Sequence, residues 1–403
     1  MNKTRRVAWF LCYAFAASWM GIGCSSSQNV DSSGQTIVID TSIGTDSADL
    51  SPWLASLEVI ALDDTSAAFF EHADKLILHG DNYIVLDRQG AKKALVFDQK
   101  GNYVTSFGTI GKGPGELLQF NNLWIKPNGY IEAYDFLSNK LVQYLPSTYR
   151  AGSERRLKTP NRYSALHPLT DSTYVGTAGY NLTDSTQNHQ GYRLALLDDF
   201  LEPFAYAAPF DEELIGLVGR SSNQPFVPSG NYISFQQSIY PTIYHIYPDG
   251  TVVSGYNFSF VQNALPADFE TSLIAPNRED FNPMSLNLQA ARALFAPYQH
   301  FAGEFWEMKD YILTLHQVDD KTRRWSLIDK ASMKTLVQSS KLQETKDHHF
   351  ALPSFTTVDV ATNTLYAVYN SMYMEMILTA NSPHRDLLKK HPDGQFLIKM
   401  KLK

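Results

Sequence analysis

The chain has 403 residues, of which 44% are hydrophobic and 19% charged, and its formal net charge is −7. A protein that binds a phosphate backbone needs a basic face, and beyond short pairs such as Arg155–Arg156 and Lys389–Lys390 the sequence has no basic run. We therefore expect no nucleic-acid partner. The 22 Tyr, the 23 Phe and the frequent β-branched residues favour a protein built from β-sheets.

The first 23 residues have the pattern of an export signal. Lys3, Arg5 and Arg6 precede an apolar run from Val7 to Gly23. A basic start, a short apolar segment and small residues before a cleavage site are typical of a secretory signal peptide. The alternative is an uncleaved anchor, for which this run has only marginal length. We predict a signal peptide over residues 1–23.

The signal ends at Cys24, in the sequence "GIGC" followed by "SSS". This ending resembles a bacterial lipobox, although Gly21 stands where leucine is usual. The only other cysteine, Cys12, lies inside the predicted signal, so the mature chain would keep a single cysteine that cannot form an internal disulfide. We predict that an acyl chain such as palmitate on Cys24 anchors an outer-membrane lipoprotein, facing the periplasm or the cell surface. Residues 24–35, which are small and polar, would form a flexible tether.

Six segments with one pattern recur along the rest of the chain. Each has a polar or glycine turn, then an aromatic residue or leucine, then β-branched or aromatic residues. They are "DNYIVLD" at Asp81, "NGYIEAYD" at Asn128, "STYVGTAG" at Ser172, "GNYISFQ" at Gly230, "DYILTLH" at Asp310 and "NTLYAVYN" at Asn363. Their anchor residues are Tyr83, Tyr130, Tyr174, Tyr232, Tyr311 and Leu365. Irregular spacing between the segments leaves room for insertions.

Most of these segments are followed by a second strand that ends in a turn, such as Asp98–Gly101 or Pro248–Gly250, where glycine adopts a positive φ without strain. Further strands flank each hairpin. The sequence therefore predicts an all-β fold over residues 36–403: a six-bladed β-propeller of four-stranded antiparallel blades with small helical insertions. Two unrelated β-domains are the alternative.

The sixth unit ends in a strand, "QFLIKMKLK" from Gln395, with no turn after it. An open sheet edge invites aggregation, so the ring needs closure. We expect an N-terminal strand, either Thr36–Asp40 or Leu57–Leu62, to pair beside this C-terminal strand.

The glycine-rich stretch "SFGTIGKGPGEL" is the most motif-like part of the chain. A Walker loop requires Ser or Thr after its lysine, but Gly113 and Pro114 follow Lys112 here. The spacing of Gly111, Gly113 and Gly115 is not that of a dinucleotide loop, and no helix follows Glu116 that could hold a phosphate at its N-terminus. We predict a loop that crosses from one blade to the next.

The longer stretch "VFDQKGNYVTSFGTIGKGPGELLQFNNLWI" resembles a signature of six-bladed β-propeller lipoproteins of Gram-negative gut anaerobes, which are similar to NHL-repeat and TolB-like propellers. The resemblance rests on a strand, an Asp-x-x-Gly turn, a strand and a Gly-x-Gly-Pro-Gly-Glu loop. The matching residues are Asp98, Gly101, Gly111, Gly113, Pro114, Gly115 and Glu116. It implies a propeller fold and a location in the cell envelope, and it implies no established reaction.

In such a ring the strands of a blade run A to D from the axis outward. The B–C and D–A loops share one face, here called the loop face, and the A–B and C–D turns share the other, here called the turn face. The long insertions fall on the loop face: Tyr180–Gly191 and Ser371–Gly394 as B–C loops, and "SFGTIGKGPGEL" and Val261–His300 as D–A crossings. Because loops on a rigid scaffold carry function, we predict that the loop face binds the ligand. The alternative is neutral drift of surface loops.

Two of these insertions have helical patterns, Met284–Gln299 and Ser382–Lys390, with Ser382 as a candidate N-cap. We expect them to cover the mouth of the propeller channel rather than to bind a partner helix.

Five polar residues end the predicted B strands at the loop face: Asp87, Asp135, Gln236, His316 and Asn370. A ring of this kind could hold a metal, a sugar or a peptide terminus, although Asp87 and Asp135 could equally be turn formers. We expect a monomeric, non-catalytic module without a cofactor that binds a glycan, a peptide or an envelope protein. Exposed aromatics such as Tyr180, Tyr298 or Trp306 would support carbohydrate binding. The alternative is a metal-dependent hydrolase or lyase at the channel mouth, for which only His316 is well placed.

Overall fold

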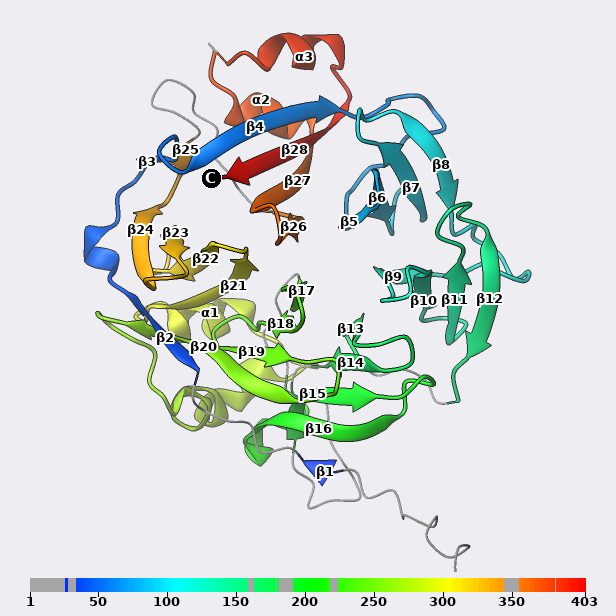
Figure 1. Ribbon diagram of the computed structural model, residues 1–403. Coiled ribbons are helices and arrows are strands. Elements are labelled where there is room, and N and C mark those ends of the chain that lie inside the picture. Colours follow the sequence, from blue (N-terminus) through cyan, green and yellow to red (C-terminus); the bar gives the residue numbers. More distant parts are fainter. Residues whose placement is uncertain are drawn as a thin grey trace, which may run out of the picture.

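The computed structural model describes residues 26–27, 34–158, 163–178, 180, 191–217, 224–343, 355–380 and 382–403. The predicted signal peptide, Cys24 and most of the predicted tether lie outside these residues. The described strands form six blades of four antiparallel strands, arranged as a ring around a central axis (Figure 1). This confirms the predicted six-bladed β-propeller.

The first three blades follow one another in the sequence, each from the axis outward. Blade 1 consists of β5 (Lys75–His79), β6 (Asn82–Asp87), β7 (Lys93–Asp98) and β8 (Tyr103–Phe107). Blade 2 consists of β9 (Phe120–Ile125), β10 (Ile131–Asp135), β11 (Lys140–Tyr144) and β12 (Ala151–Arg156). Blade 3 consists of β13 (Ala165–Pro168), β14 (Tyr174–Thr177), β15 (Gly191–Leu197) and β16 (Pro203–Phe210), with β1 (Ser26–Ser27) beside β16.

The last three blades also take up strands from the N-terminal part of the chain. Blade 4 consists of β17 (Phe226–Pro228), β18 (Ile233–Phe235), β19 (Thr242–Ile246), β20 (Val252–Phe260) and, outermost, β2 (Gln35–Ile39). Blade 5 consists of β21 (His300–Glu307), β22 (Tyr311–Gln317), β23 (Arg323–Asp329) and β24 (Lys334–Ser339). Blade 6 consists of β26 (Thr357–Asp359), β27 (Thr364–Asn370), β28 (Gln395–Leu402) and β4 (Leu54–Ala61). A small separate sheet pairs β25 (Leu342–Gln343) with β3 (Ala48–Asp49).

The second and third strands of a blade are apolar on both sides because each blade packs between two neighbours. In β6 the residues Tyr83 to Leu86 are all buried, and so are Ala94 to Phe97 in β7. This continuous apolar run replaces the alternation expected of a half-exposed sheet. The turn after β7 uses Gly101 with φ +86°, where a Cβ atom would lie 2.3 Å from the Ala61 carbonyl oxygen. Glycine at this position therefore lets blade 1 approach the end of β4.

The ring is closed by pairing of β28 with β4 in antiparallel register, from Phe396 opposite Ala61 to Leu402 opposite Leu54. Of the two predicted closing strands, Leu57–Leu62 is thus confirmed. The other candidate, Thr36–Asp40, falls in β2, which pairs in parallel with β20 of blade 4.

The helical insertions lie on the loop face. Helix α1 (Leu288–Phe295) lies within the predicted segment. In α3 (Arg385–Lys390) the N-cap position is occupied by His384 rather than by Ser382, and the His384 side chain makes no capping hydrogen bond. Helix α2 (Ser371–Ile377) was not predicted, and η1 (Thr41–Ile43), η3 (Glu212–Leu214), η4 (Glu270–Ile274) and η5 (Ala275–Phe281) are short helical turns. Figure 1 shows α1 behind blades 4 and 5 and the other two helices beside blade 6, and none of the three over the centre of the ring. None of the helices in the described part is long and apolar enough to cross a membrane.

Candidate functional site

Asp87, the first of the five predicted site residues, is fully buried at the end of β6. Its carboxylate accepts hydrogen bonds from the backbone amides of Gln89, Gly90 and Ala91 in the B–C turn, and from the amide of Glu71 in the D–A loop. Burial alone would raise the pKa of Asp87, but these four amides outweigh it and hold the pKa below its usual value. The side chain therefore joins two loops of the loop face and has its acceptor positions filled.

Asp135 has the same arrangement in blade 2. It is fully buried at the end of β10 and accepts hydrogen bonds from the amides of Leu118 and Gln119, which belong to the D–A loop. Ser138, in the B–C turn, donates both its amide and its hydroxyl to the same carboxylate. These contacts support the turn-forming role that the sequence left open for both aspartates.

The other three predicted residues lie in different surroundings. Asn370 accepts a hydrogen bond from the Tyr373 amide and so caps the N-terminus of α2. Gln236 is buried and donates to the Gln224 carbonyl oxygen. His316 is buried beside Phe260, and burial, together with the nearby Arg324 and His300, lowers its pKa to about 3. None of the five side chains hydrogen-bonds to another, so the described residues do not form a connected polar ring.

The glycine-rich loop crosses from β8 to β9, as predicted, and closes on itself. The Gly113 amide donates to the Glu116 carboxylate over 2.7 Å, and the Gly115 amide donates to the Glu154 carboxylate over 3.1 Å. Tyr144 donates its hydroxyl to the Gly115 carbonyl oxygen. The two amides that a phosphate would need are therefore occupied by the protein's own carboxylates, while Lys112 and Pro114 are exposed.

The loop face carries most of the exposed large apolar side chains. Of the 15 such residues in the described part of the chain, ten lie in D–A or B–C loops or their insertions: Phe69, Ile110, Phe136, Leu137, Val261, Met284, Leu286, Leu288, Met372 and Met376. Exposed apolar residues that gather on one face mark interaction surfaces more often than scattered ones do. They could not be identified from the sequence, because a pattern of strands and turns does not show which loop side chains remain exposed.

Asp87, Asp135 and Asn370 hold the loops that present several of these apolar residues. Asp87 binds the amide of Glu71, two residues after Phe69. Asp135 fixes the turn that contains Phe136 and Leu137, and Asn370 caps the helix that carries Met372 and Met376. Three of the predicted site residues thus position the exposed side chains of the loop face.

The aromatic residues that would have supported carbohydrate binding are not exposed. Tyr180 and Trp306 are buried, and Tyr298 is partly buried. The hydroxyl groups of Tyr180 and Tyr240 are hydrogen-bonded to each other over 2.6 Å, inside an apolar cluster that also contains Phe269 and Phe295. These rings stabilise the insertions above blades 3 to 5 and are not available to stack on a sugar.

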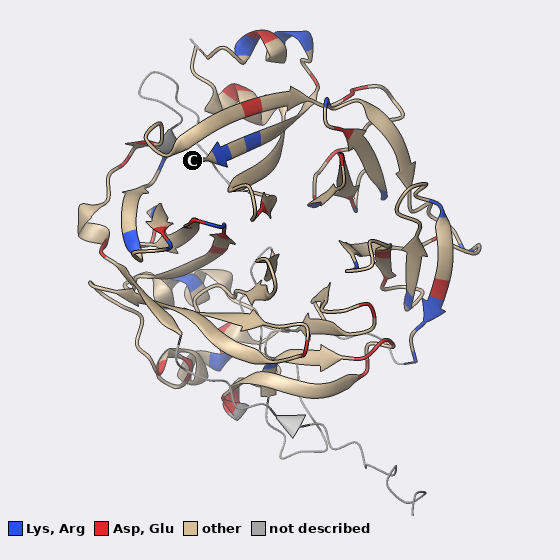
Figure 2. Ribbon diagram, viewed as in Figure 1, with Lys and Arg blue, Asp and Glu red and all other residues tan. Residues whose placement is uncertain are grey.

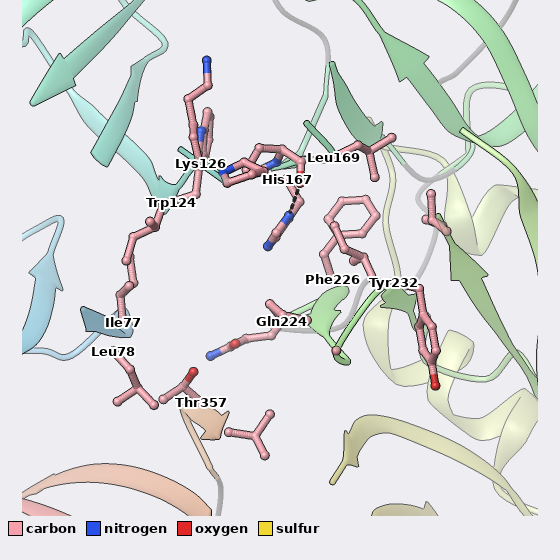
Figure 3. A pocket seen from close by; sticks show the side chains of 18 of the residues that line it. Ile77, Leu78, Trp124, Lys126, His167, Leu169, Gln224, Phe226, Tyr232 and Thr357 are labelled. Carbon is pink, nitrogen blue, oxygen red and sulfur yellow. Dashed lines mark hydrogen bonds between the residues drawn. The ribbon is translucent and has the colours of Figure 1, made fainter. Parts of the chain in front are cut away.

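A cavity of about 460 Å³ lies along the ring axis, and the sequence did not reveal it. Its walls come from the inner strands of blades 1, 2, 3, 4 and 6, and it reaches the A–B turns at Pro127, Leu169 and Gly230, on the turn face. Figure 3 shows the His167 ring and the Gln224 and Phe226 side chains around this space. None of the five predicted site residues lines it. A motif search does not find such a cavity because each blade contributes only a few residues.

The described residues contain no group of three or more His, Cys, Asp or Glu side chains that could hold a metal ion. Charged residues of both signs are interspersed around the ring (Figure 2).

These features define the class of the protein as a six-bladed β-propeller closed by its N- and C-terminal strands. Within that class, the chain belongs to the family described as "Domain of unknown function (DUF4934)", whose model matches residues 34–401. None of the curated proteins matches the chain.

One solved structure shows the same fold. The chain is similar to a "Putative exported protein" from Bacteroides fragilis NCTC 9343, with a TM-score of 0.71 and 17% identity, covering 92% of this chain and 100% of that one. A protein of unknown function from Bacteroides caccae matches with a TM-score of 0.23 and 11% identity, over 34% of this chain and 47% of that one. The β-propeller domain of Cps50 (Swd1) from Myceliophteria thermophila matches with a TM-score of 0.32 and 7% identity, over 68% and 88%. At these identities the first similarity establishes the fold alone, and the other two add no argument.

Proposed function

We propose that this protein is an exported, lipid-anchored β-propeller of the bacterial cell envelope that binds a protein partner through its loop face and catalyses no reaction. The observation that carries the proposal is the concentration of exposed apolar side chains on the loop face. Methionine and aromatic residues are enriched in protein–protein interfaces, and Met372 and Met376 are 70% and 74% exposed. A protein partner is favoured over a glycan because eight of the ten exposed apolar side chains named above are aliphatic or methionine, and only Phe69 and Phe136 of that set are aromatic.

Export and anchoring are supported by the N-terminal sequence. The basic start, the apolar run and Cys24 form the pattern of a lipoprotein signal. The similar structure from Bacteroides fragilis bears a name that describes an exported protein. The resemblance to NHL-like propeller lipoproteins is consistent with the same location.

Site-specific photo-crosslinking in cells that carry the native gene tests the loop face. A photoreactive residue in place of Leu137 or Met376 should give discrete crosslinked products, and mass spectrometry should identify the same partner from both positions. The matched control replaces Phe204, which is exposed on the outer strand of blade 3 but lies away from the loop face. Crosslinks of equal yield from Phe204, or none from Leu137 and Met376, would contradict the proposal.

A further inference from the structure

The axial cavity has the size and lining of a small-molecule site. Its volume of about 460 Å³ falls in the range of ligand pockets, and most of its wall is apolar, with Ile77, Leu78 and Phe226 among the lining residues (Figure 3). The loop face carries the proposed protein contact, whereas this cavity reaches the turn face. A ligand here would therefore be independent of the partner proposed above.

The charged groups of the lining are cationic. No Asp or Glu lines the cavity, whereas Lys75 and Lys126 do. The Lys126 ammonium turns away into the boundary between blades 2 and 3, where it donates to the Tyr174 hydroxyl over 3.1 Å and lies 3.6 Å from the Glu132 carboxylate. Lys75 has no ion pair with any described carboxylate, and its Nζ donates to the Asn122 side-chain oxygen over 3.1 Å. Lys75 is thus the cation that a ligand in the cavity would meet.

The neighbours of Lys75 keep it in place but do not neutralise it. Asn122 accepts from Lys75 and donates to the Leu166 carbonyl oxygen, so it links β5 to β13 through β9. The Nδ1 atom of His167 lies 2.8 Å from the Pro168 carbonyl oxygen, and because that oxygen can only accept, Nδ1 carries the hydrogen and donates it. Burial and the nearby Lys75 lower the pKa of His167 to about 4, so its ring is neutral at pH 7.

Burial, together with the nearby Arg88, lowers the pKa of Lys75 to about 8, so the group is still largely an ammonium at pH 7. Its described acceptor, Asn122, is neutral, and a buried cation without a countercharge costs free energy in folding. Pairing with an anion would offset this cost, and hydrogen bonds between charged groups are the strongest in proteins. A single ammonium beside a neutral imidazole and apolar walls suits one negative charge on an apolar body. Lys75 begins β5 on the side of the loop face, and Leu76 to Leu78 lead from it toward the turn face. The charge would therefore bind at the loop-face end of the cavity, and the apolar body would extend toward the turn face.

We propose that the axial cavity binds a small organic carboxylate with an apolar body, with its carboxylate paired to Lys75. A free organic acid and the C-terminus of a peptide with an apolar last residue share this chemistry. The two sources differ at the carbon next to the carboxylate, which carries a peptide nitrogen in a C-terminal residue and no such group in a simple organic acid.

Isothermal titration of the full chain in mild detergent tests the proposal with matched probes. Hexanoate and hexanamide differ in charge and hardly in shape, and Ala-Ala-Leu with a free or an amidated C-terminus forms the corresponding peptide pair. We expect the carboxylate of at least one pair to bind at least tenfold more tightly than its amide. The stronger carboxylate identifies the source. Binding of neither carboxylate, equal binding of acid and amide in both pairs, or tighter binding of inorganic phosphate overturns the proposal.

Three variants locate the bound carboxylate. Lys75→Met should weaken its binding at least tenfold, whereas Lys100→Met, on the same blade but in an exposed turn outside the cavity, should leave it unchanged. Thr357→Trp keeps Lys75 but fills the cavity from blade 6 and should also abolish binding. Unchanged binding in Lys75→Met or in Thr357→Trp overturns the assignment, and melting curves of the three variants establish that each is folded.

Discussion

At the scale of single residues, two of the tyrosine anchors of the repeat have a role that the sequence did not indicate. The Tyr174 hydroxyl in blade 3 donates to the buried Glu132 of blade 2 over 2.6 Å. The Tyr232 hydroxyl in blade 4 donates to the buried Glu307 of blade 5 over 2.6 Å. Burial would raise the pKa of Glu307, but its bonds to Lys330 and Tyr232 hold the pKa below its usual value. These contacts tie neighbouring blades through buried, satisfied carboxylates.

Replacement of Asp87 tests the loop-fixing role of the aspartates. Asp87→Asn puts an NH₂ group among four backbone amide donors, so we expect a loss of about 1–3 kcal/mol in the free energy of unfolding at pH 7, measured by urea denaturation. The pKa of Asp87 is lower in the folded chain than in the unfolded chain. Its stabilisation is therefore complete above about pH 4 and is lost as the pH falls through the folded-state value.

The difference between wild type and Asp87→Asn should accordingly shrink in acid. The control is Asp386→Asn, because Asp386 is exposed on α3 and pairs only with Lys389 at the surface. That change should alter the free energy of unfolding by less than about 0.5 kcal/mol. If Asp87→Asn were as stable as wild type at pH 7, the carboxylate would not hold the two loops together.

At the scale of elements, strands with strong local signals could be predicted and pairings between distant segments could not. The runs that became β6, β10 and β22 are apolar stretches bounded by turns, and they form the predicted second strands. The closing strand remained ambiguous because β2 and β4 both read as apolar strands. Their different partners, β20 and β28, lie about 220 and 340 residues away in the sequence.

The candidate site was less predictable than the fold. The inner strands β17 and β26 have only three residues each, so they give no clear strand signal, yet they line the axial cavity. Helix α2 was missed because its apolar residues lie on both sides: Met374 and Ile377 are buried, whereas Met372 and Met376 are exposed, so "SMYMEMI" shows no clear amphipathic pattern. Polar strand ends could be found from the sequence, but their hydrogen-bond partners in the loops could not.

Removal of β28 tests the closure of the ring. Deletion of residues 396–403 removes five buried apolar side chains: Phe396, Leu397, Ile398, Met400 and Leu402. Each contributes about 1.5–3 kcal/mol, and together they approach the whole stability of a domain, about 5–15 kcal/mol. Because β28 lies between β27 and β4, the deletion also leaves β4 without a partner strand and exposes one edge of β27, which stays paired with β26. We expect the truncated chain to aggregate or to lose its cooperative melting transition.

Deletion of Lys403 alone is the control for that truncation. Lys403 bonds to the backbone of Trp53 and Pro52 at the surface and contributes no apolar core. The control should melt within a few degrees of wild type. A similar result for the longer deletion would contradict a ring whose closure depends on β28.

At the scale of the whole molecule, the N-terminal strands set the orientation of the ring relative to its proposed anchor. Ser26 pairs in parallel with Ala205, near the start of β16, and Gln35 pairs in parallel with Tyr256 in β20. The outer strands run from the turn face to the loop face, so the chain enters blades 3 and 4 from the side of the turn face. An acyl chain on Cys24, two residues before Ser26, would place the turn face toward the membrane. The loop face and its exposed apolar residues would then point away from the membrane, where a partner can reach them.

Replacement of the two cysteines tests this anchor. Wild type should partition into the detergent phase and incorporate labelled palmitate, because each buried CH₂ contributes about 0.8 kcal/mol to membrane binding. Cys24→Ser should stay in the aqueous phase or be poorly processed. Any Cys24→Ser protein that is recovered should melt like wild type, because no residue of the ring changes.

Cys12→Ser is the matched control: Cys12 lies in the predicted signal peptide, so this variant should be lipidated and should partition as wild type does. Equal partitioning of Cys24→Ser and wild type would remove both the anchor and the membrane-facing orientation of the ring.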